Sequence, residues 1–383
     1  MENMFLKYSF VILTVIATIG CNQIKDKQFF KEPASTVNIK IDQIKVDSFF
    51  LEKNPSSYVG FLQVNNDQLF FIDKKFCKIF QFDTTGQYIE NYLKTGKGPG
   101  EINTGEITTA CFTKDFRVFI GKSYDVHIFT KNWEKDDNFF INWQIEHSRN
   151  EMLKDFQPSM PGLYSPVYYK FILRKHNKHV FFPIQSQHPE FNFVESKNYY
   201  ENARVLAKLD LQTGKVVDLL GRFSPVYQQF NNIGQFSLVN FDIAPNGDFY
   251  LSYEADSVIY QYDADFNIKN AFGCKGKEME QGYKEILNKQ DFQHNYKKQR
   301  ETKGYYTWIE YIAQRDLLFR SYQKSGTKAN DGLQIYNDSI LLGDVEVPKG
   351  MRVIGYIEPY FYSSTDIDEM GEKIKVYRFK ISL

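Results

Sequence analysis

Short stretches in which hydrophobic and polar residues alternate recur along the whole chain. The clearest spans residues 69–82, and a close counterpart spans 249–262. Each joins one alternating segment through a short polar loop to a second, which ends at an Asp- or Gly-containing turn. Alternation with a period of two, rather than 3.6, predicts strands that bury one face. Weaker copies begin at Val118 and Val205.

The spacing of these copies predicts a β-propeller. The residues that end the second alternating segment, Asp83, Thr130, Asp210 and Asp263, lie 47, 80 and 53 residues apart. A propeller blade takes about 40–50 residues, so the longest interval corresponds to one blade with an insertion. We therefore predict six blades, over residues 57–94, 105–143, 168–221, 236–273, 305–347 and 351–380.

The last predicted blade has three clear strands and needs a fourth. The alternating segment 36–46, near the other end of the chain, can supply it. Such closure removes the exposed edges that make open sheets prone to aggregation. The predicted fold class is all-β, a six-bladed β-propeller closed by an N-terminal strand and occupying residues 36–383. Two packed β-sandwiches are the alternative all-β arrangement.

The first twenty residues have the pattern of a secretory signal. Lys7 precedes an apolar run over residues 10–19, which is too short to span a bilayer and ends at Gly20-Cys21. This ending resembles a lipobox, which implies a signal peptide over 1–20 and lipid attachment at Cys21. An ordinary signal peptide that happens to end in cysteine is the alternative. Residues 21–35 are polar and predict a tether.

Composition narrows the class of partner. Lys plus Arg and Asp plus Glu are equal at 47 each, so the chain lacks the basic field that nucleic-acid binding needs. The 35 Phe and 26 Tyr favour strands. After Cys21 the cysteines are Cys77, Cys111 and Cys274, an odd and widely spaced set that predicts buried free thiols rather than a disulfide framework.

One repeat carries a family resemblance. The run Asp73–Asp83, followed by Gly96-Lys97-Gly98-Pro99-Gly100-Glu101, resembles the repeat unit of TolB-like and NHL-like six-bladed propellers. Together with the lipobox, the chain is similar to the propeller lipoproteins of unknown function of Bacteroidota. The resemblance implies a lipid anchor and a cell-envelope location at the outer membrane, with the side of that membrane left open. It supplies no substrate and no catalytic residues.

Propeller ligands usually bind at the face formed by the links between blades and the loops between second and third strands. Long insertions at 144–167, 185–202 and 274–304, the last with helical character, are expected to wall a central funnel there. The candidate ligand-binding residues in these loops and links are Lys97, Tyr124, His188, Arg222 and Tyr253. A phosphate-binding role for the glycine-rich link is disfavoured, because it lacks the Gly-Lys-Ser/Thr ending.

Catalytic motifs are absent from the sequence. It contains no Gly-x-Ser-x-Gly, and the pair His176 and His179 flanks an Asn-Lys turn without further metal ligands. The leading hypothesis is a lipid-anchored module that binds or assembles with an envelope protein, a peptide or a glycan, without a cofactor. The alternative is a calcium-dependent hydrolase or lactonase using the funnel, with oxygen ligands from Glu106, Asn240, Asp242 and Glu310.

Overall fold

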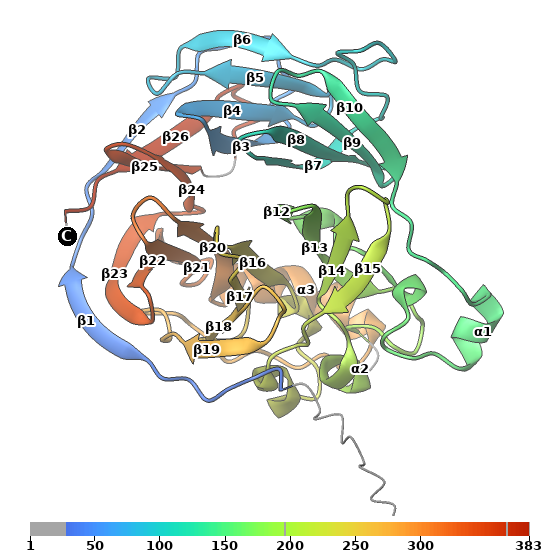
Figure 1. Ribbon diagram of the computed structural model, residues 1–383. Coiled ribbons are helices and arrows are strands. Elements are labelled where there is room, and N and C mark those ends of the chain that lie inside the picture. The colour runs from blue at the N-terminus through green and yellow to red at the C-terminus, as the bar shows by residue number, and fades with distance from the viewer. Residues whose placement is uncertain (1–27, 195–196, 365–366, 383) are drawn as a thin grey trace, which may run out of the picture.

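The computed structural model describes residues 28–194, 197–364 and 367–382, which form six β-sheets arranged in a ring (Figure 1). Each sheet is built mainly from consecutive antiparallel strands, as the spacing of the repeats predicted. The six-bladed propeller is therefore confirmed. Among the described residues, no helix is both long and apolar enough to cross a membrane.

The first three blades follow the predicted spans closely. Blade one contains β3 (Gly60–Asn65), β4 (Gln68–Asp73), β5 (Lys78–Phe82) and β6 (Tyr88–Tyr92). Blade two contains β7 (Ile107–Phe112), β8 (Phe116–Gly121), β9 (Asp125–Thr130) and β10 (Lys135–Phe140). Blade three contains β11 (Tyr164–Pro166), β12 (Arg174–His176), β13 (His179–Ser186), β14 (Leu206–Asp210) and β15 (Val216–Leu220).

The remaining blades complete the ring. Blade four contains β16 (Val239–Ile243), β17 (Phe249–Tyr253), β18 (Ile259–Tyr262) and β19 (Ile268–Phe272). Blade five contains β20 (Tyr305–Ile312), β21 (Leu317–Gln323), β22 (Asn330–Asn337) and β23 (Ile340–Pro348). Blade six contains β24 (Arg352–Ile357), β25 (Tyr360–Ser364) and β26 (Lys375–Phe379).

An N-terminal strand closes the ring, but it lies further along the chain than expected. The fourth strand of blade six is β2 (Val46–Phe50), which pairs antiparallel with β26. Most of the predicted closing segment instead forms β1 (Thr36–Ile41), which pairs in parallel with β23 at the outer edge of blade five (Figure 1). Both segments alternate, so the pattern alone could not say which edge each would join.

The chain before β1 lies against blade four. The backbone N–H of Ala34 donates to the carbonyl of Ala271, and the Ser35 hydroxyl donates to the carbonyl of Gly273. The Phe30 ring packs edge-on against Tyr260. Residues 28–35, which the sequence placed in the tether, are therefore held on the propeller. Cys21 lies outside the described residues.

Three insertions carry helices. They are α1 (Arg149–Lys154) between blades two and three, α2 (Lys197–Asn202) within blade three, and α3 (Lys289–Thr302) between blades four and five. Ser148 caps α1 through a capping box, and Asn288 caps α3 by accepting from the backbone N–H of Asp291.

Apolar side chains between adjacent blades make up the core. The buried aromatic side chains include Tyr306 and Tyr362 from the strands and Tyr199 and Tyr200 from α2. Cys77, Cys111 and Cys274 are free thiols, as predicted, and only Cys77 is fully buried. The bend between His176 and His179 is a tight turn joining β12 to β13, with Asn177 at φ 52°.

Candidate functional site: the central funnel

A central funnel of about 360 Å³ runs between the inner strands of blades one, two, three, five and six. Blade three shapes it, because its inner strand is interrupted. Strand β11 pairs with residues 184–186 of β13, and β12 pairs with 179–181, so the chain between them leaves the sheet. This excursion includes the 3-10 helix η2 (Tyr168–Lys170), whose residues line the funnel.

The funnel lining combines exposed aromatic rings with polar atoms that have no partner. Tyr168 is 40% exposed and Tyr169 57% exposed. Thr108 Oγ1 and Arg352 Nε are buried, and neither has a hydrogen-bond partner in the described structure. Buried polar groups in native proteins are nearly always paired, so these two atoms point to a ligand or bound water.

A buried carboxylate organises one side of this site. Glu254 is fully buried, and its two oxygens bind the Arg300 guanidinium at 2.8 and 2.9 Å. The Lys170 ammonium lies 3.4 Å from Glu254 Oε1. Burial opposes the ionisation of Glu254, but Arg300 and Lys170 outweigh it and hold the pKa of the carboxyl below its usual value. Helix α3 is thereby fastened beside the funnel through Arg300, at the link predicted to be helical.

Lys170 has an unusual titration. Burial removes water from its ammonium and lowers its pKa to about 8, although Glu254 opposes the shift. We therefore expect Lys170 to react with acetic anhydride along a pH profile centred near 8. Peptide mass spectrometry would measure the rates, with Lys297, whose side chain is 87% exposed, as the reference in the same digest. A Lys170 profile centred above pH 10 would contradict this assignment.

Another arginine of the funnel lining, Arg174, contacts two carboxyl groups. Arg174 Nε lies 2.7 Å from Asp242 Oδ1, and Arg174 Nη2 lies 2.6 Å from Glu310 Oε2. Burial raises the pKa of Asp242 and raises that of Glu310 to about 8, with Arg174 opposing both shifts. Cys111, also in the lining, has its pKa raised to about 11 by burial, so its thiol is held protonated at neutral pH.

Three of the four residues considered for calcium bind cationic side chains: Arg174 contacts Asp242 and Glu310, and Glu106 pairs with Lys75 at 2.9 Å. The Asn240 amide nitrogen donates to the carbonyl of Tyr306, and its buried oxygen has no hydrogen-bond partner in the described structure. Within the part of the chain that the structure describes, no three His, Cys, Asp or Glu side chains group so as to hold a metal. The structure therefore gives no support to the calcium alternative.

The predicted ligand-binding residues do not converge on one site. Tyr253 is fully buried and donates to the carbonyl of Arg222, whose guanidinium lies over the ring of Phe29. His188 is buried and accepts from the backbone N–H of Glu190. The remaining two stand apart from these: Tyr124 packs on Phe171, and Lys97 lines a separate pocket.

Two comparisons with solved structures agree with this fold. No protein-family model matches the sequence, and no curated protein matches it. The chain is similar to a crystal structure of a DUF4221 family member from Bacteroides vulgatus, with a TM-score of 0.65, 13% identity, and coverage of 89% of this chain and 98% of that one. The chain is also similar to a candidate exported protein from Bacteroides fragilis, with a TM-score of 0.55, 12% identity, and coverage of 91% of this chain and 99% of that one. Both likenesses concern the fold.

Sequence reasoning missed several residues that line the funnel, namely Tyr168, Tyr169, Lys170, Arg174 and Arg352. The segment 167–173 is rich in apolar and aromatic residues, which is also the pattern of an inner strand. A charged lysine between two tyrosines and a phenylalanine was the available signal. Only the pairing of β11 and β12 with the same strand shows that this segment leaves the sheet.

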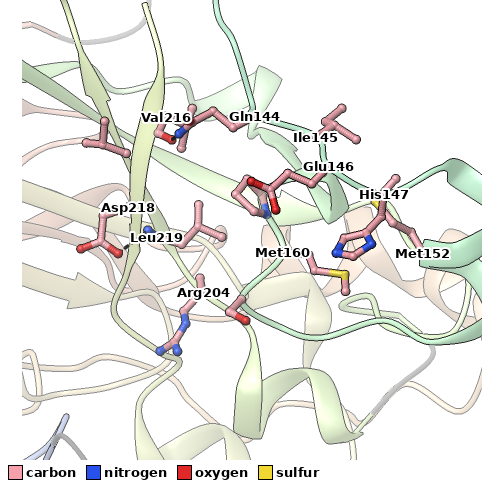
Figure 2. Close-up of a pocket in the computed structure, with 14 residues that line it drawn as sticks. Gln144, Ile145, Glu146, His147, Met152, Met160, Arg204, Val216, Asp218 and Leu219 are labelled. Carbon is pink, nitrogen blue, oxygen red and sulfur yellow. Dashed lines mark hydrogen bonds between the residues drawn. The ribbon is translucent and has the colours of Figure 1, made fainter. Parts of the chain in front are cut away.

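A second pocket, of about 400 Å³, lies at the rim of blade three (Figure 2). One wall is residues 216–219 of β15, and the other belongs to the insertion before β11, from which Glu146, His147 and Met160 face the strand (Figure 2). The Gln144 side-chain amide donates to the Val216 carbonyl at 2.6 Å and fixes the insertion to the strand edge. Unlike the funnel lining, the described lining of this pocket contains no buried side-chain polar atom without a hydrogen-bond partner, so we consider the funnel the better candidate site.

Proposed function

We propose that this chain is a lipid-anchored lipoprotein of the cell envelope whose TolB-like or NHL-like propeller acts as a binding or assembly module, with the funnel as its ligand site. The observation that carries the binding role is the funnel lining. It exposes Tyr168 and Tyr169 and buries the unpartnered atoms Thr108 Oγ1 and Arg352 Nε.

The charges of the site indicate the chemistry of its partner. Lys170 and Arg300 share the single carboxylate of Glu254, and Arg352 forms no ion pair with any of the described residues. The site therefore carries an excess of positive charge beside two exposed tyrosine rings. A peptide or glycan that presents a carboxylate, free or on an envelope protein, fits this combination.

The two parts of the proposal are tested in the same bacterial cells. Metabolic labelling with an alkyne fatty acid is expected to label the wild-type protein and place it in the membrane pellet. Cys21→Ser should lose the label and appear as a folded soluble protein, whereas Cys274→Ser should keep the label. A label that persists in Cys21→Ser would contradict lipid attachment at Cys21. The binding role could still be tested separately.

Binding is tested by crosslinking in intact cells followed by quantitative recovery of partners. Tyr168→Ser combined with Tyr169→Ser should reduce recovery of the specific partner at least about fivefold, because exposed aromatic rings dominate such contacts. Tyr88→Ser, on the outer strand of blade one, is the matched control. Equal recovery from the double variant and the control would rule out the funnel as the binding site.

A further inference from the structure

A separate pocket of about 290 Å³ lies at the rim of blade two, beside the glycine-rich link that leads into it from blade one. The link supplies Lys97 and Asn103, the turn after β8 supplies Ser123, and strands β9 and β10 supply His127, Lys135 and Asn138. The pocket is distinct from the funnel, because the two share no lining residue.

The base of this pocket holds a buried histidine with one unused nitrogen. His127 is 3% exposed, and its Nε2 lies 2.6 Å from Asp125 Oδ2. Asp125 is positioned in turn by Thr104, whose hydroxyl lies 3.4 Å from the other carboxylate oxygen. His127 Nδ1 is buried and has no hydrogen-bond partner in the described structure. The hydrogen bond to Asp125 fixes the orientation of the imidazole ring in the lining of the pocket.

Gly121 allows this close packing. A Cβ at Gly121 would lie 2.1 Å from Thr104 Oγ1 and 2.4 Å from Asp125 Oδ1, so a side chain there would displace both. The turn that carries Ser123 therefore approaches the Asp125–His127 pair only because this position is glycine.

The other polar side chains around the pocket also have no partner among the described residues. Among the described residues, no side-chain hydrogen bond or ion pair engages Lys97, Asn103, Ser123, Lys135 or Asn138. The glycine-rich link already holds an anion of its own, since Glu101 accepts from the backbone N–H of Gly98 at 2.7 Å and pairs with Lys94 at 3.1 Å. The Lys97 ammonium is therefore available to a ligand in the pocket.

We propose that this pocket binds a small polyhydroxylated anion, a monosaccharide that carries a carboxylate or phosphate group. The ammonium groups of Lys97 and Lys135 attract the anionic group, and the amides of Asn103 and Asn138 and the Ser123 hydroxyl suit ring hydroxyls. The His127 ring, which Asp125 holds in place, forms part of the pocket lining. Phe140, which is 69% exposed, offers an apolar face at the rim. The volume, at the small end for ligand pockets, fits one sugar unit.

Calorimetric titration of the full-length protein in detergent tests this proposal with four probes: galacturonate, galactose 6-phosphate, galactose and inorganic phosphate. One of the two anionic sugars is expected to bind saturably, which also decides between carboxylate and phosphate. Lys97→Gln and Lys135→Gln should each weaken binding about fivefold or more, because each removes a charge-assisted contact. Lys114→Gln, an exposed lysine of the same blade outside the pocket, should leave binding unchanged.

His127→Asn is expected to weaken binding as well, because it removes a ring that forms part of the lining. Lys97, which is exposed, and Lys135, which is half-buried, keep the test decisive if the histidine variant fails to fold. The proposal is overturned if neither anionic sugar binds at millimolar concentration, or if the lysine substitutions have no effect. If galactose bound equally well, the ligand would not need an anionic group. If inorganic phosphate bound equally well, the ligand would not need a sugar. Either result would overturn the proposal. Tyr168→Ser should leave this binding intact, so failure here is distinguishable from failure of the funnel proposal.

Discussion

Arg320→Ala is expected to lower the free energy of unfolding by about 4 kcal/mol, because it removes a large buried side chain and the hydrogen bonds that it donates. Arg320 lies in β21 of blade five and is fully buried. Its guanidinium donates to the Ser252 hydroxyl at 2.8 Å and to the carbonyls of Ser257 and Asp256, all in blade four. It also stacks on the Tyr306 ring, so one side chain joins two blades.

Truncation to alanine would leave these acceptors buried without a donor and open a cavity between the blades. Urea denaturation followed by circular dichroism measures the change. Arg149→Ala, at an exposed position in α1, is the control and should change stability by less than about 0.5 kcal/mol. Arg320→Lys should recover only part of the loss, since an ammonium cannot reproduce the planar fork. A loss below about 1 kcal/mol in Arg320→Ala would contradict this account.

Glu254→Gln is expected to cost about 3 kcal/mol or more at neutral pH, because it leaves the cations of Lys170 and Arg300 in a buried site without their shared carboxylate. The loss should loosen α3, whose attachment beside the funnel includes Arg300. Denaturation measures the loss, and protection of α3 amides in hydrogen exchange reports on the helix. Glu301→Gln, in the same helix with its side chain 61% exposed, is the matched control.

The pH dependence of this difference has a definite sign. The pKa of Glu254 is lower in the folded protein than its ordinary value of 4.5, so its ionised form stabilises the fold above that pH. This contribution is lost as pH falls through the folded-state pKa. The gap in stability between wild type and Glu254→Gln should therefore be widest above about pH 5 and shrink on acidification. A gap that is constant from pH 7 to pH 4 would show that the carboxylate charge does not matter.

The number and order of the blades could be predicted from the sequence, because strand alternation and turn residues are local signals. The run 69–82, for example, carries both strands β4 and β5 and the loop between them. Closure could be predicted only in outline. Segments 36–41 and 46–50 both alternate, and the edges they join belong to blades about 300 residues away in the chain. In the structure, Asp47 of β2 faces Arg378 of β26 and forms an ion pair with it at 2.9 Å.

The candidate site could be predicted less well, because it depends on which side chains meet. Asp242 and Glu310, which the sequence suggested only as possible calcium ligands on inner strands, both contact Arg174, and Arg174 comes from another blade. Its guanidinium contacts both carboxyl groups, so neither is free to bind a cation. Tyr253 and His188 belonged to the expected loops, yet both side chains are buried.

By itself, the sequence determined the all-β class, the six blades, the free Cys77, Cys111 and Cys274, and the equal numbers of acidic and basic residues, since each follows from local pattern or composition. The tertiary structure alone decided that residues 167–173 leave the sheet and enter the funnel, that Glu254 binds Arg300 and Lys170, and that His127 keeps one nitrogen unused. The physical reason is the same in each case. Alternation fixes the face on which a side chain lies, whereas its partner across the ring is fixed only when the blades pack together.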